Sequence, residues 1–315
     1  MKTPVNIVFI FFFFGILTSC NESNSAKDQG MLSDHVSEDT VKQDSNTTQK
    51  FNPSDAFKSY WYAGEAEISS YKLEQARYGE MREGTAVLIY VTEDFLPEEQ
   101  VKADNFDKTN IPILKLNTTK TFNTGIYPYA IMESTFFPIV NNQYAVKLSS
   151  SIQEWCGQTY TQLNNRDQFE IIAHSYFEGE GDKDFSLDKA ILENELWTQL
   201  RLDPKSLPVG ELEVIPSMAY IQLKHIELKA YKAIATLNSG AYTLSYPDLK
   251  RDLIMYYNTN FPYEILSWEE TYNDSYGSNA ARLTTKATRL KTIKSPYWNK
   301  NSNADENLRE TLKLK

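Results

Sequence analysis

Cys156 and His174 are the two residues of this sequence whose chemistry could support nucleophilic catalysis. A thiol needs a neighbouring base, and the two residues lie on adjacent predicted strands, Glu154–Leu163 and Phe169–Phe177. The strand register decides whether they meet: a three-residue loop at 164–166 places Cys156 opposite His174, whereas a four-residue loop at 164–167 pairs Cys156 with Ser175. A small buried thiol and a packed strand histidine are the simpler interpretation, so we expect no catalytic pair.

Four carboxylates occur at every second position in one short segment, and they are Glu178, Glu180, Asp182 and Asp184. Alternating oxygen ligands suit calcium, which takes 6–8 oxygens. The order does not match an EF-hand loop, however, and an acidic loop before a helix is the simpler interpretation. His174 and His225 have no second cysteine nearby, so a zinc site would lack ligands of the usual spacing. We therefore expect no metal and no cofactor.

The last predicted strand, Arg282–Ile293, carries a basic stripe on an acidic protein. Its members, with one residue just beyond the strand, are Arg282, Lys286, Arg289, Lys291 and Lys294. Charge of this kind protects an exposed edge strand against pairing with another chain. The alternative is an electrostatic contact with an acidic partner or a lipid headgroup.

Cys20 follows a short apolar segment at the N-terminus. Lys2 precedes a run from Val5 to Leu17 that is apolar apart from Asn6, which is the layout of a secretory signal and is too short to span a bilayer. Residues 17–20, Leu-Thr-Ser-Cys, resemble the lipobox of bacterial lipoproteins, in which the cysteine becomes the lipidated N-terminus. We therefore expect residues 1–19 to be a signal peptide and Cys20 to hold the protein to a membrane. Asn21, rather than Asp, favours the outer membrane of the cell envelope.

Charge and motifs exclude several classes of function. The net charge is −10, and an acidic protein repels nucleic acid, whose binding depends on Lys and Arg. The sequence contains no G-x-S-x-G, Walker or G-x-G-x-x-G pattern. Its two cysteines allow no intramolecular disulfide if Cys20 carries lipid.

Short aromatic and β-branched runs separated by polar turns predict a mainly β fold. We expect a large, curved antiparallel sheet, as a sandwich or an open barrel, with one packed helix at about Leu187–Leu200 capped by Ser186. The predicted strands are Trp61–Tyr71, Ala86–Phe95, Ile113–Leu116, Ile126–Phe137, Tyr144–Ser150, Glu154–Leu163, Phe169–Phe177, Glu213–Leu223, Leu228–Leu237, Ala241–Tyr246, Leu253–Tyr257, Tyr263–Tyr272 and Arg282–Ile293. In the first of these, Ala66, Ile68 and Ser70 interleave with Glu67 and Ser69, which is typical of a strand with one face in solvent.

Composition divides the rest of the chain. Residues 20–52 are almost wholly polar and predict a disordered tether, about 30 Å in mean reach. Residues 53–300 are expected to form a single domain, because no second linker is present, and residues 301–315 a polar tail of low order.

Residues from about Tyr60 to Trp298 resemble a family of Gram-negative lipoproteins of unknown function. The segments that carry the resemblance are 61–67 (WYAGEAE), 71–80 (YKLEQARYGE) and 153–157 (QEWCG). Members are sometimes labelled "septum formation inhibitor Maf", but the Ser/Arg-rich phosphate-binding motif of the cytoplasmic Maf pyrophosphatases is missing from this chain. The resemblance implies a lipoprotein and no particular activity.

Two functions remain open from the sequence. The first is a non-enzymatic envelope lipoprotein that binds an apolar ligand, or another envelope component, on its sheet. The second is a periplasmic hydrolase whose site the sequence does not reveal.

Overall fold

A single curved β-sheet dominates the structure. The computed structural model describes residues 52–314, apart from 141–142 and 275–280. Its sixteen strands are β1 (Ala66–Arg77), β2 (Glu80–Leu96), β3 (Val101–Lys102), β4 (Ile111–Thr124), β5 (Tyr127–Pro138), β6 (Lys147–Glu154), β7 (Gly157–Asn165), β8 (Phe169–Ser175), β9 (Lys183–Leu187), β10 (Ile191–Leu192), β11 (Gly210–Ile215), β12 (Tyr231–Asn238), β13 (Ala241–Tyr246), β14 (Arg251–Tyr257), β15 (Ile265–Asp274) and β16 (Ala281–Ser295). The helices are α1 (Asp55–Trp61), α2 (Glu193–Leu202), α3 (Met218–Lys224) and α4 (Asn307–Thr311).

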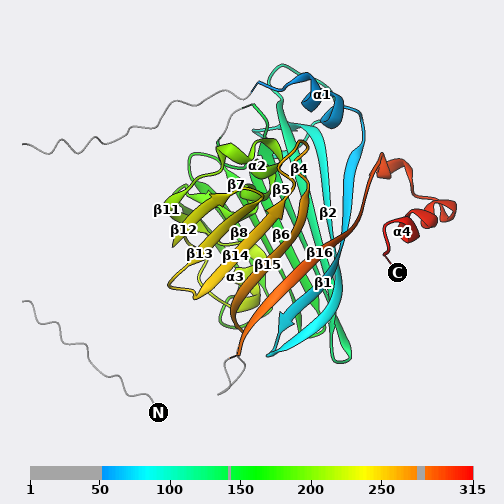
Figure 1. Ribbon diagram of the computed structural model, residues 1–315. Helices are drawn as coiled ribbons and strands as arrows, with labels where there is room; N and C mark the ends of the chain where they lie inside the picture. The colour runs from blue at the N-terminus through cyan, green and yellow to red at the C-terminus, as the bar shows by residue number, and fades with distance from the viewer. Residues whose placement is uncertain (1–51, 141–142, 275–280, 315) are drawn as a thin grey trace, which may run out of the picture. The chain divides into compact units, whose positions relative to one another are not determined.

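The order of the strands shows how the sheet is assembled. The sheet runs β10-β11-β12-β13-β14-β15-β16-β1-β2-β4-β5-β6-β7-β8-β9, and β3 pairs with β2. Pairing of β1 with β16 joins the two halves of the sheet (Figure 1). The two edge strands, β9 and β10, are therefore neighbours in the sequence. All pairs are antiparallel except β10 with β11. The predicted fold class is therefore confirmed as one open curved sheet, not a sandwich.

Helix α2 lies on the concave side of the sheet. The Tyr90 hydroxyl of β2 donates to the Trp197 carbonyl at 3.1 Å, and the Trp197 ring packs against Trp268 of β15 with centroids 5.2 Å apart. Contacts to both halves of the sheet require the helix to lie between them. Nearly all of its residues are buried, including charged ones.

The predicted helix at Leu187–Leu200 begins too early. Lys183–Leu187 pairs with β8 as β9, and Ile191–Leu192 pairs with β11 as β10, so sheet hydrogen bonds take up those residues and Ser186 caps nothing. The helix starts at Glu193, where the Glu195 side chain accepts from the Leu192 N–H at 3.1 Å. It ends before Asp203-Pro204, as predicted.

Two further segments predicted as strands are partly helical. The run Glu213–Leu223 is a strand only to Ile215, and α3 follows with Ser217 as its cap, accepting from the Tyr220 N–H at 3.2 Å. At the other end of the domain Trp61 closes α1, which Ser54 caps. In both cases a local capping serine outweighed the β-branched and aromatic composition.

The C-terminal segment, predicted from its composition to be a polar tail, contains the short helix α4 and packs against the sheet. Leu312, just after α4, packs with Ala66 and Ile68 on the convex face of β1, and the Ser70 hydroxyl donates to the Leu312 carbonyl. This cover explains why residues 66–71 are all buried, although their alternating pattern predicted one solvent face.

Candidate functional site

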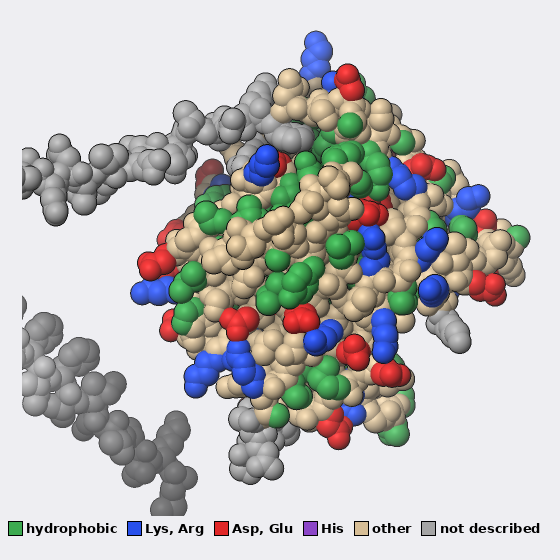
Figure 2. Space-filling view, in the orientation of Figure 1, with side chains coloured by type: hydrophobic (Ala, Val, Ile, Leu, Met, Phe, Trp, Pro, Cys, Tyr) green, Lys and Arg blue, Asp and Glu red, His purple; other side chains and the backbone are tan. Residues whose placement is uncertain are grey.

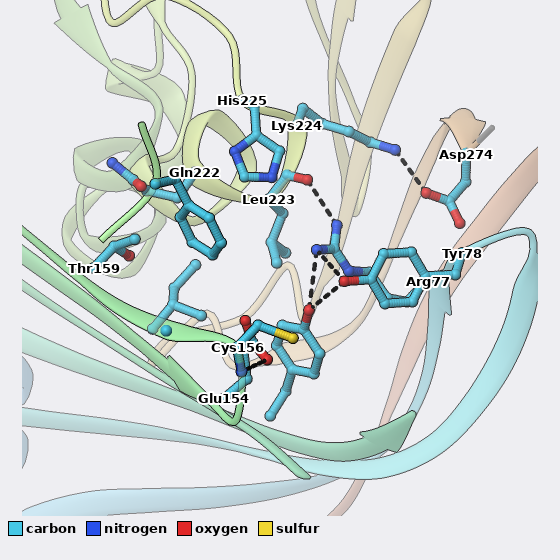
Figure 3. A pocket seen from close by; sticks show the side chains of 14 residues that line it. Arg77, Tyr78, Glu154, Cys156, Thr159, Gln222, Leu223, Lys224, His225 and Asp274 are labelled. Carbon is cyan, nitrogen blue, oxygen red and sulfur yellow. Dashed lines mark hydrogen bonds and ion pairs between the residues drawn. The ribbon is translucent and has the colours of Figure 1, made fainter. Parts of the chain in front are cut away.

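A pocket of about 370 Å³ opens at one end of the curved sheet, beside the last turn of α3 (Figure 3). The turns between β1 and β2 and between β6 and β7 form its walls. Its lining residues are Arg77, Tyr78, Tyr129, Ile152, Glu154, Cys156, Gly157, Thr159, Phe177, Gln222, Leu223, Lys224, His225 and Asp274. Volumes of 300–1,000 Å³ are typical of small-molecule sites.

Arg77 is the buried cation of this pocket. The last residue of β1, it is 8% exposed and donates to the Leu223 carbonyl at 2.7 Å and to the Tyr129 and Tyr78 hydroxyls at 3.1 and 3.2 Å (Figure 3). Burial lowers the pKa of Arg77, but these tyrosines raise it further, so the net shift is upward and the group stays charged. Within residues 52–314, less the two gaps, no carboxylate forms an ion pair with it; Asp274 instead binds Lys224 at 2.7 Å.

Three buried polar atoms of the pocket lack a hydrogen-bond partner among the described residues. They are Arg77 Nε, Thr159 Oγ1 and Gln222 Oε1. The other end of the Gln222 amide has a partner, because its Nε2 donates to Thr161 Oγ1 at 3.1 Å. An unpaired buried polar group costs about 1–3 kcal/mol, so three of them in one pocket indicate a place for polar atoms from outside the chain.

Aromatic and aliphatic side chains beside Arg77 supply the apolar part of the pocket wall. Tyr78 and Tyr129 share a hydroxyl contact of 2.7 Å, and the Tyr129 ring stacks on Phe122 at 5.0 Å. Ile152 and Phe177 add apolar surface. The pocket is thus amphipathic, with a cationic and polar end inside aromatic walls.

The strand register separates Cys156 from His174. The β7–β8 hairpin pairs Asn165 with Phe169 and Tyr160 with His174, which is neither of the two registers considered from the sequence. Cys156 lies in the turn before β7, whereas His174 is an exposed residue of β8 with its Nδ1 3.2 Å from Asp182. The strand pairing that a Cys156–His174 dyad required is absent.

The thiol of Cys156 is exposed and faces a carboxylate. The Cys156 N–H donates to Glu154 Oε2 at 2.7 Å, and the same carboxylate raises the pKa of the thiol. A raised pKa lowers the population of thiolate, which is the reactive form.

His225 belongs to this pocket, which no pattern in the sequence indicates. It ends α3 in the left-handed conformation, with φ of 52°, its ring lies against Phe177 at 5.4 Å, and its Nδ1 is 2.6 Å from Glu180 Oε1. The αL position follows from the tertiary fold, and no glycine or asparagine marks it in the sequence.

The acidic segment does not converge on a metal site. Glu180 contacts His225 and accepts from the Ser175 hydroxyl at 2.6 Å, Asp182 contacts His174, and Asp184 lies on β9. No group of three or more His, Cys, Asp or Glu side chains in the described part of the chain is placed to hold a metal ion. The segment instead lines a second, more open hollow of about 550 Å³ beside the sheet edge β9.

The basic stripe lies inside the sheet, because β16 pairs with β15 on one side and β1 on the other. The interpretation of Arg282–Ile293 as an edge strand is therefore wrong. Most of its charges are already matched: Arg282 binds Asp252, Lys286 binds Glu269 at 2.9 Å, Arg289 binds Glu264 at 3.0 Å, and Lys294 donates to the Tyr60 carbonyl. Figure 2 shows both signs of charge side by side on this face. Lys291 completes the stripe and pairs in the ladder with Ser70.

Cys20 and the expected signal and tether lie outside the described residues. Among the residues that are described, no helix is long and apolar enough to cross a bilayer.

Comparison with known proteins assigns no family. No protein-family model matches the chain, and no curated protein matches it. Among solved structures, it is similar to a β-barrel-like protein of a domain of unknown function, DUF1849, from Brucella abortus. That similarity covers 73% of this chain and 98% of the other, at 7% identity and a TM-score of 0.43.

Proposed function

We propose that this protein is a non-enzymatic, membrane-anchored binding protein that holds an anionic amphiphile in the pocket beside α3. The observation that carries the proposal is the Arg77 guanidinium, buried without a carboxylate partner in the described chain and surrounded by unpaired polar atoms and aromatic rings. A buried cation in an acidic protein is best compensated by an anion, and the described chain does not supply it.

The pocket suggests how such a ligand would bind. Its carboxylate or phosphate would accept hydrogen bonds from Arg77 Nε, which can only donate, and from the Thr159 hydroxyl, which can donate as well as accept. Its apolar part would lie against Tyr78, Tyr129 and Phe177. Charged and apolar contacts in one pocket select an amphiphile over a purely apolar or purely polar molecule.

The anchoring part of the proposal depends on the sequence around Cys20. A lipobox at 17–20 and a polar segment to residue 52 support a domain tethered to a membrane outside the cytoplasm, with the outer membrane favoured by Asn21. Acyl chains contribute about 0.8 kcal/mol per buried CH₂, so several chains on one cysteine make the anchoring permanent.

An enzyme based on Cys156 is the second candidate. The supporting observation is that Cys156 and His225, a nucleophile and a base by residue type, line the same pocket and that Glu180 contacts the imidazole. Against it stands Glu154, which raises the pKa of the thiol. Nucleophilic cysteines require the opposite shift.

The test measures the fluorescence of cis-parinarate, an anionic fatty acid, against its neutral methyl ester. Purified full-length chain should bind the acid more tightly than the ester. Thr159→Val removes an unpaired hydroxyl at constant shape, so it should leave the fold as stable or more stable and weaken binding of the acid about tenfold, the equivalent of one lost hydrogen bond.

Ser150→Ala is the matched control, because Ser150 carries another buried, unpartnered hydroxyl that does not line the pocket. It should leave parinarate binding unchanged. Equal affinity for the acid and the ester, or equal effects of the two substitutions, would reject the pocket as an anion-binding site.

A further inference from the structure

Large apolar side chains are exposed at the same end of the sheet as the pocket. Ile126 is 86% exposed, Tyr176 80% and Trp155 69%. Of the four most exposed large apolar residues among those described, only Phe106, at 80%, lies elsewhere, in the connection that leads into β4 at the other end of the sheet. Single apolar side chains scattered over a surface need no explanation, but three of the four most exposed ones lie at the same end of the sheet as the pocket, and this grouping does.

These side chains come from three successive turns that contact one another. Ile126 is the last residue before β5, which begins at Tyr127, and the Tyr127 ring stacks on Trp155 of the β6–β7 turn with centroids 6.3 Å apart. Tyr176 continues the row after β8, where its N–H donates to the Gln158 carbonyl at 3.4 Å. We call Ile126, Tyr127, Trp155, Tyr176 and Phe177 the aromatic rim.

Glycine at position 157 permits this arrangement. A Cβ there would lie 3.2 Å from two atoms of the Tyr176 side chain and 3.4 Å from the Phe177 ring. The turn therefore packs directly against the neighbouring aromatic residues. Because Phe177, Cys156 and Gly157 also line the pocket, the aromatic rim borders its mouth.

We propose that the aromatic rim docks on the surface of a lipid bilayer with uncharged headgroups and that the pocket takes its amphiphilic ligand from that bilayer. Tyr and Trp combine an apolar ring with a polar group and favour the membrane–water interface. The rim's side chains project from turns, whose backbone polar groups remain in contact with headgroups and water.

Charge selects the kind of bilayer. The protein carries a net charge of −10, and Glu154 adjoins the rim at Trp155. Repulsion from anionic lipid makes zwitterionic phosphatidylcholine the better docking surface. An anionic amphiphile with a long apolar part resides in a bilayer, so a mouth that touches the bilayer shortens its path into the pocket.

This inference rests on the proposed function for the identity of the ligand, whereas contact with the bilayer can be measured without any ligand. The chain has five tryptophans, of which Trp61 and Trp268 are buried and Trp197, in α2, is half-buried against the concave side of the sheet. Trp155 reports on the rim, and Trp298, in the connection after β16, reports on the far end of the sheet.

The contact experiment mixes full-length protein with phosphatidylcholine vesicles brominated on their acyl chains. In a Trp298→Phe variant, bromine should quench the part of the tryptophan fluorescence that Trp155 contributes. In a Trp155→Phe variant, which keeps Trp298 and the three tryptophans inside the fold, it should quench none. Anionic lipid in the vesicles should reduce the quenching of Trp155. Unquenched Trp155, or equal quenching of both reporters, would overturn docking through the rim even if the pocket binds parinarate.

The transfer experiment separates the rim from the pocket. Substituting Ile126, Trp155 and Tyr176 together by Ser should slow parinarate uptake from vesicles about tenfold or more, because a barrier change of 1.4 kcal/mol is a factor of ten. It should leave affinity for monomeric parinarate in solution unchanged. Phe106→Ser, the control of equal exposure at the far end, should change neither. Unchanged uptake by the rim variant would overturn the proposal, whereas loss of binding in Thr159→Val with intact quenching would concern the pocket alone.

Discussion

Removing one charge of the buried Glu67–Arg201 pair should lower the free energy of unfolding by about 3–5 kcal/mol. The Arg201 Nη1 and Nη2 atoms each donate to a Glu67 oxygen at 2.6 Å, and Arg201 Nε donates to the Pro262 carbonyl at 2.9 Å. Both side chains are almost completely shielded from solvent. The pair joins the end of α2 to the start of β1, so it fixes the enclosed helix to the sheet.

The size of the effect follows from what each substitution leaves behind. Glu67→Leu leaves the Arg201 guanidinium buried without its counter-charge, between the rings of Trp61 and Tyr90, and Arg201→Met leaves the Glu67 carboxylate with the Tyr60 hydroxyl. At about 2–4 °C per kcal/mol for a domain of this size, Tm should fall by roughly 6–20 °C. Glu67→Leu combined with Arg201→Met removes both charges at similar volume and should lie within about 2 kcal/mol of the wild type.

A double-mutant cycle measured by urea unfolding, with tryptophan fluorescence as the signal, gives the coupling energy directly. The exposed pair of Lys286 and Glu269, 2.9 Å apart on the surface of the sheet, is the matched control and should couple by less than about 1 kcal/mol. A coupling of Glu67 and Arg201 as small as that of the control would refute the reasoning, because burial would then have added nothing to the pair.

Three further predictions concern the interior, the thiol and the C-terminus. Burial raises the pKa of Glu195 to about 8, although backbone N–H groups lower it, so the folded chain keeps a proton that the unfolded chain loses near pH 4.5. The free energy of unfolding should therefore fall by about 3 kcal/mol from pH 4.5 to pH 7 and level off above about pH 8. Glu195→Leu should flatten this pH dependence. Cys156→Ser should leave parinarate binding within about twofold of the wild type in titrations, since the protonated thiol forms no essential contact; a larger loss would revive the thiol as a functional group. Leu312→Ala should cost about 2 kcal/mol in urea unfolding by uncovering Ala66 and Ile68, and no loss would mean that the C-terminal segment does not cover β1 in solution.

Local patterns predicted much of the sheet, because alternation and turn residues act over a few positions. The strand Ala241–Tyr246 was predicted with its observed limits, and Leu253–Tyr257 differs from β14 by two residues. Errors occurred where long-range contacts or capping decided the outcome. Ser217 turned part of a predicted strand into α3, and pairing with β8 placed Ser186 and Leu187, the predicted cap and first residue of the helix, in β9.

The pocket could not be predicted from local patterns. Arg77 and Gln222 come from β1 and α3, and only the pairing of β1 with β16 brings these parts of the chain around one concave space. In the sequence, nothing distinguishes Arg77 from an ordinary charged residue at the end of a strand. Its burial becomes visible only when Tyr129 and the Leu223 carbonyl, contributed by other elements, are placed around it.

Buried charge connects the fold to the proposed function. The other buried arginines of the concave side have carboxylate partners: Arg201 binds Glu67, and Arg251 binds Glu193 and Glu270. Arg77 has only hydroxyls and a carbonyl in the described chain. Since the same interior supplies carboxylates to the two arginines that hold the structure together, the missing carboxylate at Arg77 is better explained by an anion that arrives from outside than by a requirement of folding.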